Sequence, residues 1–248
     1  MIILSIFFFI TAILYSSVGF GGGSTYLALL LIWDIPYYIF PVIALVCNII
    51  VVTGNSINYI RAGNHNIKLL IPFLIGSIPL AFLGGTLKID KEIFEILLFL
   101  VLSIAGFLLL LNNKAYENKK IIIRKLNSIV SIIIGSILGF VSGVVGIGGG
   151  IFLSPILFLL KADNPKNIVT TASLFILVNS ISGVFGQLTK ENIFSELIIY
   201  LPLFLSVLIG GLLGNYINLK IFSNRDLALI TSLLVIFVAI RMGFKIFT

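Results

Sequence analysis

The sequence predicts an all-α polytopic membrane protein, and three observations support this fold class. Of the 248 residues, 59% are hydrophobic and only 10% are charged, whereas about a quarter of the residues in a soluble domain are charged. The mean hydropathy is +1.22. Asp, Glu, Lys, Arg and His are absent from six stretches: residues 1–33, 35–60, 69–87, 126–160, 167–189 and 197–219. This pattern excludes disordered, collagen-like, coiled-coil and disulfide-rich secreted chains.

Two of the uncharged stretches are too long to be single straight spans. A helix as long as residues 1–33 would measure about 50 Å, whereas the hydrocarbon core of a bilayer is about 30 Å thick. The same holds for residues 126–160, and both stretches carry a glycine cluster near their middle. We therefore expect each stretch to form two partial helices joined by a hairpin-like turn at membrane depth.

The remaining apolar segments complete two homologous halves. Six ordinary transmembrane helices are predicted at about residues 36–54, 69–87, 94–111, 168–187, 197–217 and 227–246. Each half is a glycine-broken segment followed by three such helices, in residues 1–113 and 126–248, and a basic linker, 114–125, joins the halves. The glycine clusters recur at an offset of 127 residues, and Pro72 and Gly84 recur at an offset of 130 as Pro202 and Gly214. Paired interrupted segments of this kind are typical of transporters.

The distribution of the 16 Lys and Arg residues predicts the orientation. If each broken segment re-enters on its own side, eleven share the side of the linker: Arg61, Lys68, Lys114, Lys119, Lys120, Arg124, Lys125, Lys161, Lys166, Lys220 and Arg225. If each broken segment crosses once, ten share that side. Both arrangements place the linker in the cytoplasm of a cell-membrane protein, since cytoplasmic loops are rich in Lys and Arg. We favour the first, which gives three crossings per half and hence inverted repeats, with parallel repeats as the alternative.

The glycine clusters form the predicted substrate site. After each cluster a helix begins, and its first N–H groups lack partners while its dipole places about half a positive charge there. Such a helix N-terminus can bind an anion. The candidate residues are Gly19, Gly21, Gly22, Gly23, Ser24 and Thr25 in the first half, and Gly146, Gly148, Gly149 and Gly150 in the second. The alternative is that small residues, such as Gly139, Gly143 and Gly146, permit close helix packing.

Polar side chains within the spans are candidates for the wall of this site. Asn48 belongs to the second segment of the first half, and Thr171 and Asn179 share a helix face in its counterpart. Neutral donors of this type bind an oxyanion and still release it. The alternative is that these side chains form hydrogen bonds between helices, typically for less than about 1 kcal/mol each.

The motifs Ser17–Gly23 and Ser142–Gly150 resemble those of the sulfite exporter TauE/SafE family of four-TMS-duplication membrane permeases. Length, internal repeat and middle loop agree as well, so the resemblance covers essentially the whole chain. It implies export or uptake of sulfite, sulfoacetate or related small organosulfur anions, with coupling to protons often assumed. The expected partners are such an anion and the lipid bilayer, and the sequence leaves a homo-oligomer open.

Other functions find less support in the sequence. One His, one Cys and no acidic pair within a span provide no set of catalytic residues and no metal site, so we expect neither an enzyme nor a cofactor. The basic linker lacks the aromatic interleaving of a nucleic-acid site. An ion channel or a non-transporting membrane protein is the remaining alternative. All acidic residues lie at or near segment ends, so we expect no buried carboxylate as a proton relay, and any coupled proton would travel on the substrate.

Overall fold

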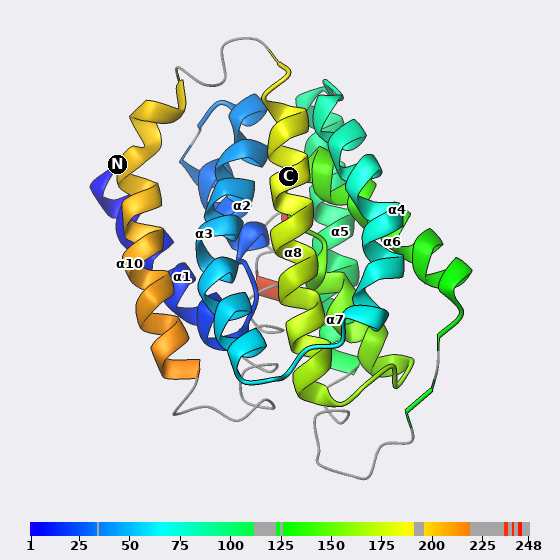
Figure 1. Cartoon of the computed structure of the whole chain (residues 1–248). Helices are drawn as coiled ribbons and strands as arrows, with labels where there is room; N and C mark the ends of the chain where they lie inside the picture. Colours follow the sequence, from blue (N-terminus) through cyan, green and yellow to red (C-terminus); the bar gives the residue numbers. More distant parts are fainter. Residues whose placement is uncertain are drawn as a thin grey trace.

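The computed structural model is all-helical in the part of the chain that it describes, which comprises residues 1–33, 35–111, 123–124, 126–190, 196–218, 236–237, 240 and 243–244 (Figure 1). The predicted all-α fold is therefore confirmed. Most of the linker 114–125 and of the predicted span 227–246 lies outside the described residues.

Both predicted breaks are present, and each broken segment is a hairpin with arms of unequal length. In the first half, α1 (Ile2–Val18) is followed by α2 (Gly23–Ile32), and in the second, α6 (Ser128–Val145) is followed by α7 (Gly150–Leu159). The outer ends of each hairpin lie on the same side. The backbone N–H of Arg124 donates to the Lys161 carbonyl (3.0 Å), and the rings of Phe7 and Trp33 lie 5.5 Å apart.

Four of the other helices agree with the predicted spans: α4 (Ile67–Thr86), α5 (Lys91–Leu111), α8 (Pro165–Gln187) and α10 (Leu201–Asn218). The fifth, α3 (Phe40–Arg61), overlaps its predicted span but is displaced along the chain. Short 3₁₀ turns, Tyr37–Ile39 and Ile198–Tyr200, precede α3 and α10. Among the described residues, five helices are long and apolar enough to cross a bilayer: α3, α4, α6, α8 and α10.

One predicted boundary was wrong, because α3 continues past residue 54 to Arg61. Asn55 and Ser56, which follow the predicted end, belong to the helix. In the structure both side chains are buried, and the Ser56 hydroxyl lies 3.2 Å from that of Ser173 on α8. Contact with the other repeat therefore provides a partner for Ser56, whereas Asn55 Nδ2 has no hydrogen-bond partner among the described residues.

The two repeats are interleaved. α4 of the first half packs against α6 of the second, and α10, the counterpart of α4, packs against α1, the counterpart of α6. Figure 1 shows the α1–α10 pair on one side and the α4–α6 pair on the other, with α3 and α8 between them. α3 and α8 also contact each other, so corresponding helices of the two halves meet in the centre of the molecule.

Glycines bring the paired helices into backbone contact. On α6, Gly135, Gly139 and Gly143 lie against the backbone of α4, so the expected packing role applies to Gly139 and Gly143. On α10, a Cβ on Gly210 would lie 2.5 Å from the Phe9 carbonyl oxygen of α1. Bulkier residues at these positions would force the helices apart.

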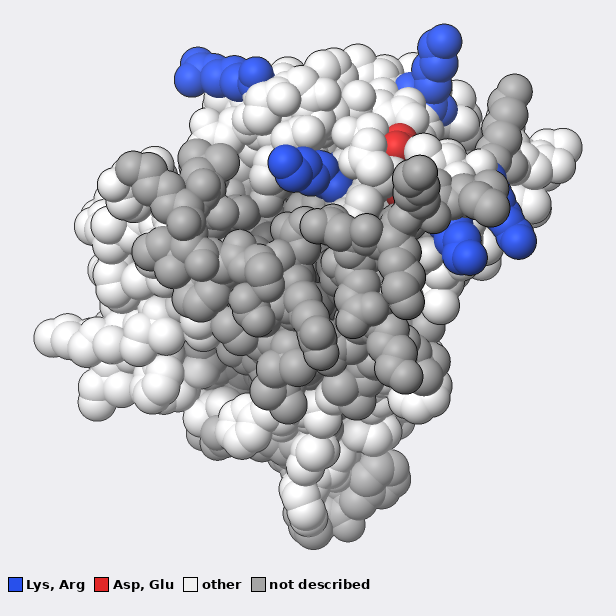
Figure 2. All heavy atoms as spheres, turned by 90° about the horizontal axis from the view of Figure 1, so that it is seen from below, with Lys and Arg blue, Asp and Glu red and all other residues white. Residues whose placement is uncertain are grey.

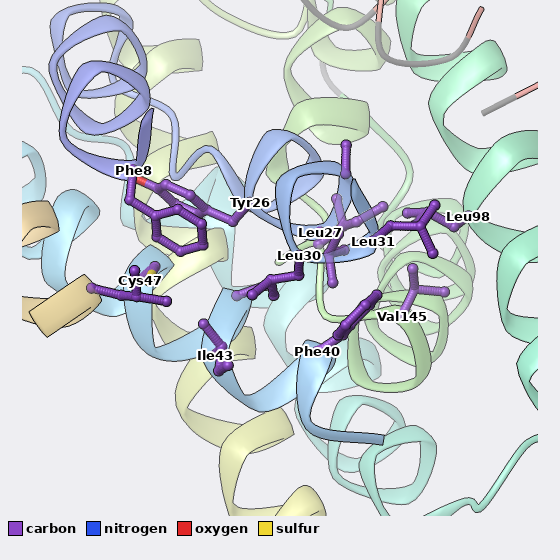
Figure 3. Packing of buried hydrophobic residues seen from close by; sticks show 14 of the residues in the cluster. Phe8, Tyr26, Leu27, Leu30, Leu31, Phe40, Ile43, Cys47, Leu98 and Val145 are labelled. Carbon is purple, nitrogen blue, oxygen red and sulfur yellow. The ribbon is translucent and has the colours of Figure 1, made fainter. Parts of the chain in front are cut away.

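The apolar core surrounds the short arm of the first hairpin. Figure 3 shows Tyr26, Leu27, Leu30 and Leu31 of α2 packed between side chains of α1, α3, α5 and α6. The rings of Phe8 and Tyr26 stack at 4.7 Å. Cys47 is buried in the same cluster, where it packs against apolar side chains.

Basic side chains gather at the end of the molecule that carries the α3–α4 and α7–α8 connections (Figure 2). The described members are exposed: Arg61, Lys68, Arg124, Lys161 and Lys166.

Asp163 lies at a segment end as predicted, but it is buried, at 5% exposure, contrary to the expectation of no buried carboxylate. It accepts hydrogen bonds from Asn66 Nδ2 (2.6 Å) and from the Asn164 N–H (2.7 Å), so it joins α4 to the α7–α8 connection.

Lys190 follows α8 and lies near Lys88, which follows α4. Its Nζ donates to Gln187 Oε1 (2.8 Å), and Gln187 Nε2 donates to the Gly143 carbonyl of α6 (2.8 Å). Partial burial lowers the pKa of Lys190 to about 8, and the positive charge of Lys88 adds to this shift.

Two adjacent glycines of α10 provide a matched test of the interleaved packing. Gly210→Ala should lower the free energy of unfolding by about 1–3 kcal/mol, because its methyl group meets the α1 backbone. Gly211→Ala should be neutral or slightly stabilising, since its nearest neighbour is Val51 at 3.6 Å and alanine favours helix. Thermal unfolding in detergent measures both, and equal losses would contradict the α1–α10 contact.

Candidate functional site

Glycine forms both turns because the backbone there has positive φ. α1 ends at Gly19 (φ 84°) and α2 starts after Gly22 (φ 83°), while α6 ends at Gly146 (φ 90°) and α7 starts after Gly149 (φ 75°). Side chains with a Cβ rarely adopt this conformation. We call residues 19–23 loop 1 and residues 146–150 loop 2. Every residue of both loops is buried.

The two loops meet in the interior of the protein. A Cβ on Gly23 of loop 1 would lie 3.0 Å from the Ile147 carbonyl oxygen of loop 2. Segments 127 residues apart in the sequence are thus in van der Waals contact. The sequence predicted both turns, and the structure brings them together.

Asn48 of α3 lies between the loops. Its side chain is fully buried, and its Nδ2 donates to the Ile147 carbonyl of loop 2 (3.1 Å). Nδ2 also lies 2.8 Å from the position that a Cβ would occupy on Gly23 or on Gly148. Asn48 Oδ1, which faces Gly21, has no hydrogen-bond partner in the described part of the chain. Asn48 is therefore next to both loops, and its role in substrate binding stays a prediction.

The helix starts that follow the loops retain unpaired donors. Among the described residues, the backbone N–H groups of residues 21–24 and 147–151 form no hydrogen bond with other protein groups. Their helices begin to pair only at Thr25 and Phe152, which both donate to the N-cap carbonyls. Buried backbone N–H groups are paired in the great majority of cases. Two sets of free donors, each at the positive end of a helix dipole, can together hold a negative charge.

The hydroxyl groups next to loop 1 form a small network. Tyr15 of α1 places its OH 2.8 Å from Thr25 Oγ1 and 3.2 Å from Ser24 Oγ. All three side chains are buried. Ser24 and Thr25, expected as hydroxyl donors, thus each form a hydrogen bond with the Tyr15 hydroxyl, in which either oxygen can be the donor.

A cavity of about 10 Å³ lies between the loops. Its lining residues are Tyr15, Phe20, Gly21, Gly22, Gly23, Ser24, Ile147, Ile151 and Ile176. This volume is about that of one water molecule. The site is therefore closed in this structure, and an oxyanion would enter only after the loops separate. None of the lining residues carries a charge.

The predicted residues on α8 lie less directly at the loops. Asn179 is buried and its Nδ2 donates to the Phe175 carbonyl of its own helix (2.8 Å), while Thr171 is buried with its hydroxyl unpaired in the described part of the chain. Neither residue lines the cavity. Ile176 of the same helix contacts Gly148 and Gly150 instead. A role in substrate binding for Thr171 and Asn179 stays a prediction.

Sequence reasoning missed five lining residues: Tyr15, Phe20, Ile147, Ile151 and Ile176. Four of them are apolar, and apolar residues give no signal against the background of a membrane helix. Tyr15 had a signal, because it lies one helical turn before Gly19 and its phenol needs a partner when buried.

The bridging role of Asn48 predicts a difference between two asparagine variants. Asn48→Ala leaves the buried Ile147 carbonyl without its side-chain donor, which should cost about 1–3 kcal/mol of unfolding free energy. Asn179→Ala should cost less, since the Phe175 carbonyl also belongs to the hydrogen-bond ladder of α8. Unfolding in detergent measures both, and a larger loss for Asn179→Ala would contradict the bridge.

Comparisons with known proteins agree with this architecture. The chain is 26% identical to a probable membrane transporter protein of Sinorhizobium fredii, over 96% of each chain. It is 24% identical to one of Bacillus subtilis, over 93% of this chain and 92% of the relative, and 30% identical to one of Methanocaldococcus jannaschii, over 91% and 89%. No solved structure matches significantly. The family model for sulfite exporter TauE/SafE matches residues 4–242, so the chain belongs to this family of membrane transporters.

Proposed function

We propose that this transporter is a secondary permease for small sulfur-containing organic or inorganic anions, such as sulfite or sulfoacetate. The observation that carries the proposal is the meeting of two glycine loops whose buried N–H groups are unpaired within the described part of the chain. Away from water, such donors bind a negative charge more strongly than they would at a surface. The matching family is that of the sulfite exporters TauE/SafE, which supports a sulfur-containing anion as the substrate.

The absence of charge from the cavity lining suits a carrier. A buried Lys or Arg would hold an oxyanion strongly, whereas amide and hydroxyl donors form weaker bonds that can be exchanged. A cation channel would need inward-pointing carboxylates or a carbonyl filter. The lining contains no carboxylate and exposes helix N-termini, which favours an anion as the transported species.

We also infer that the two halves are inverted repeats with the basic linker in the cytoplasm. The hairpin of each broken segment returns to the side on which it began, and α3, α4 and α5 then make three crossings in the first half. An odd number of crossings reverses the orientation of the second half. Basic side chains at the α3–α4 and α7–α8 end support the cytoplasmic assignment of that end. In this arrangement the loops can open alternately to either side.

Uptake into liposomes tests the anion permease. The purified protein should carry labelled sulfite or sulfoacetate and leave a cation control outside. Gly23→Ala should reduce uptake about tenfold or more, a loss of ~1.4 kcal/mol, since its methyl group would lie 2.8 Å from Asn48 Nδ2 and 3.0 Å from the Ile147 carbonyl.

Gly54→Ala in α3 is the matched control. Its methyl group would meet only the Asn215 side chain, at 3.3 Å, and it should retain uptake. Cation flux without anion flux would overturn the proposal in favour of a channel. Uptake by Gly23→Ala equal to that of the control would remove the loops from the transport path.

Proton coupling, where present, should depend on the substrate. The described acidic side chains, Asp90, Glu92, Glu95, Asp163 and Glu196, lie at helix ends or in connections, away from the loops. An inward proton gradient should therefore drive accumulation of sulfite, which can bind a proton, but not of methanesulfonate, which stays ionised. The membrane potential is clamped in both assays. Equal stimulation of the two anions would show that the protein itself carries the proton.

A further inference from the structure

A buried carboxylate anchors the outer end of the arm that carries loop 2. Asp163 follows α7 and is 5% exposed. Asn66 Nδ2 donates to its Oδ2 (2.6 Å), while the Asn164 N–H (2.7 Å) and Asn167 Nδ2 (3.1 Å) donate to its Oδ1. All three donors are neutral, and Asn66 and Asn164 are the N-cap residues of α4 and α8. One carboxylate thus joins the end of α7 to the starts of two helices, whose dipoles favour a negative charge there.

The turn before Asp163 is held in an unfavourable conformation. Lys161 has a φ of 52°, which residues other than glycine rarely adopt. Its N–H donates to the Phe158 carbonyl (3.1 Å), and the Ala162 N–H donates to the Leu157 carbonyl (3.0 Å). Glycine is the usual residue at such a helix end. A left-handed lysine persists only where surrounding contacts hold it, and the hydrogen bonds of Asp163 are such contacts.

A matching contact holds the outer end of the arm that carries loop 1. Tyr38 follows α2, and its hydroxyl donates to Glu196 Oε2 (2.8 Å). Glu196 precedes α10 as Asn66 precedes α4. These two residues are 130 positions apart, which is the offset that relates Pro72 to Pro202. Both contacts therefore join the end of a short arm to the segment before a helix of the other repeat.

The two contacts lie at opposite ends of the molecule because α3 spans it. α3 begins beside Tyr38 and ends at Arg61, one of the exposed basic side chains at the end with the α7–α8 connection. We call this the basic end and the other the far end. In Figure 1 the start of α10 lies at the far end, and the α3–α4 connection, which contains Asn66, lies at the basic end.

Behind each contact, the short arm packs with the same two helices. α7 shares an apolar cluster with α4 and α8, and α2 shares one with α10 and α3. Further along, the two helices of each pair touch. A Cβ on Gly186 of α8 would meet the Phe82 carbonyl oxygen of α4, and one on Gly54 of α3 would lie 3.3 Å from an α10 side chain. The starts of each pair can therefore separate only when the hydrogen bond between them breaks.

We propose that Asp163 and Glu196 are positioning residues of two latches that control access to the loops. The basic-end latch, Asn66 with Asp163, keeps α7 against α4 and α8, and its opening exposes the α7 side of the loops. The far-end latch, Tyr38 with Glu196, keeps α2 against α3 and α10, and its opening exposes the α2 side. One latch opens at a time, as alternating access requires. The latches act on the movement of the loops and are independent of the anion that the loops bind.

Two buried thiols report the two openings separately. Cys47 is fully buried in the apolar cluster that contains Tyr26 of α2. Ser154 of α7 is fully buried, and its hydroxyl has no partner in the described part of the chain. Ser154→Cys combined with Cys47→Ser therefore places a single thiol in the other arm. Alkylation by a hydrophilic maleimide in detergent, followed by mass spectrometry, measures how often each thiol is exposed.

The basic-end latch is tested by an exchange of its partners. Asp163→Asn should raise the alkylation rate of the Ser154→Cys thiol about threefold or more, because the new amide group opposes Asn66 Nδ2 and a hydrogen bond to a charged group is lost. The rate at Cys47 should not rise. Asp90→Asn is the matched control, since it removes the same charge from an exposed position. Asn66→Asp added to Asp163→Asn restores a carboxylate–amide pair and should restore the parent rate.

The far-end latch is tested by removal of one hydroxyl. Tyr38→Phe should raise the alkylation rate of Cys47 about twofold or more and leave that of the Ser154→Cys thiol unchanged, because it removes the donor to Glu196. Tyr37→Phe is the matched control, because it removes a neighbouring hydroxyl and leaves the hydrogen bond of Tyr38 in place.

Exposure at one end alone distinguishes a latch from general stabilisation of the fold. An increase at both thiols in either variant, or no increase over the controls, would overturn the proposal. So would a failure of Asn66→Asp to rescue Asp163→Asn. If Asp163→Asn does not fold in a thermal unfolding assay, Asn66→Ser removes the same hydrogen bond and keeps an N-cap for α4. Alkylation needs no transported anion, so these outcomes do not depend on the proposed substrate.

Discussion

Unpaired peptide groups at the centre of a membrane protein are the constraint on which this structure depends. Hydrocarbon offers no hydrogen-bond partner, so a broken helix is tolerated only where protein covers the break or a polar cavity adjoins it. Here each break is covered by its own repeat and by the other repeat together. Loop 1 lies against Ile147 of loop 2, Gly146 of loop 2 lies against Pro41 of α3, and Asn48 supplies one hydrogen bond across the junction.

The interleaved helices follow from the same constraint. The long arm of each hairpin is held by a helix of the other repeat, through backbone contacts at Gly139 on α6 and Gly210 on α10. A movement that opens the closed cavity therefore cannot separate one repeat from the other as rigid bodies. It has to move helix pairs that contain one member from each repeat, namely α1 with α10 and α4 with α6.

Segment lengths and the positions of charged residues predicted the helical class, both hairpins and the position of the glycine turns. These features depend on residues that are close together in the sequence. It did not predict what lies opposite each turn. The hydroxyl groups of Ser24 and Thr25 pair with Tyr15, and Asn48 contacts both loops. α3 was predicted too short for the same reason, since Ser56 meets Ser173 only in the folded protein. Such contacts depend on how the repeats pack.

Both loops lead into a helix N-terminus, although Gly148 has positive φ and its counterpart Gly21 does not. Backbone and side chains have different physical roles in this junction. Two helix N-termini provide a positive field that any anion experiences, whichever side it enters from. Field alone does not distinguish one small anion from another, because it acts on charge and not on shape. Discrimination requires side chains that differ between the repeats, and the exchange of Ser24 for Ile151 at corresponding positions provides one such difference. A site with two identical walls would bind the charge and leave the rest of the molecule unrecognised.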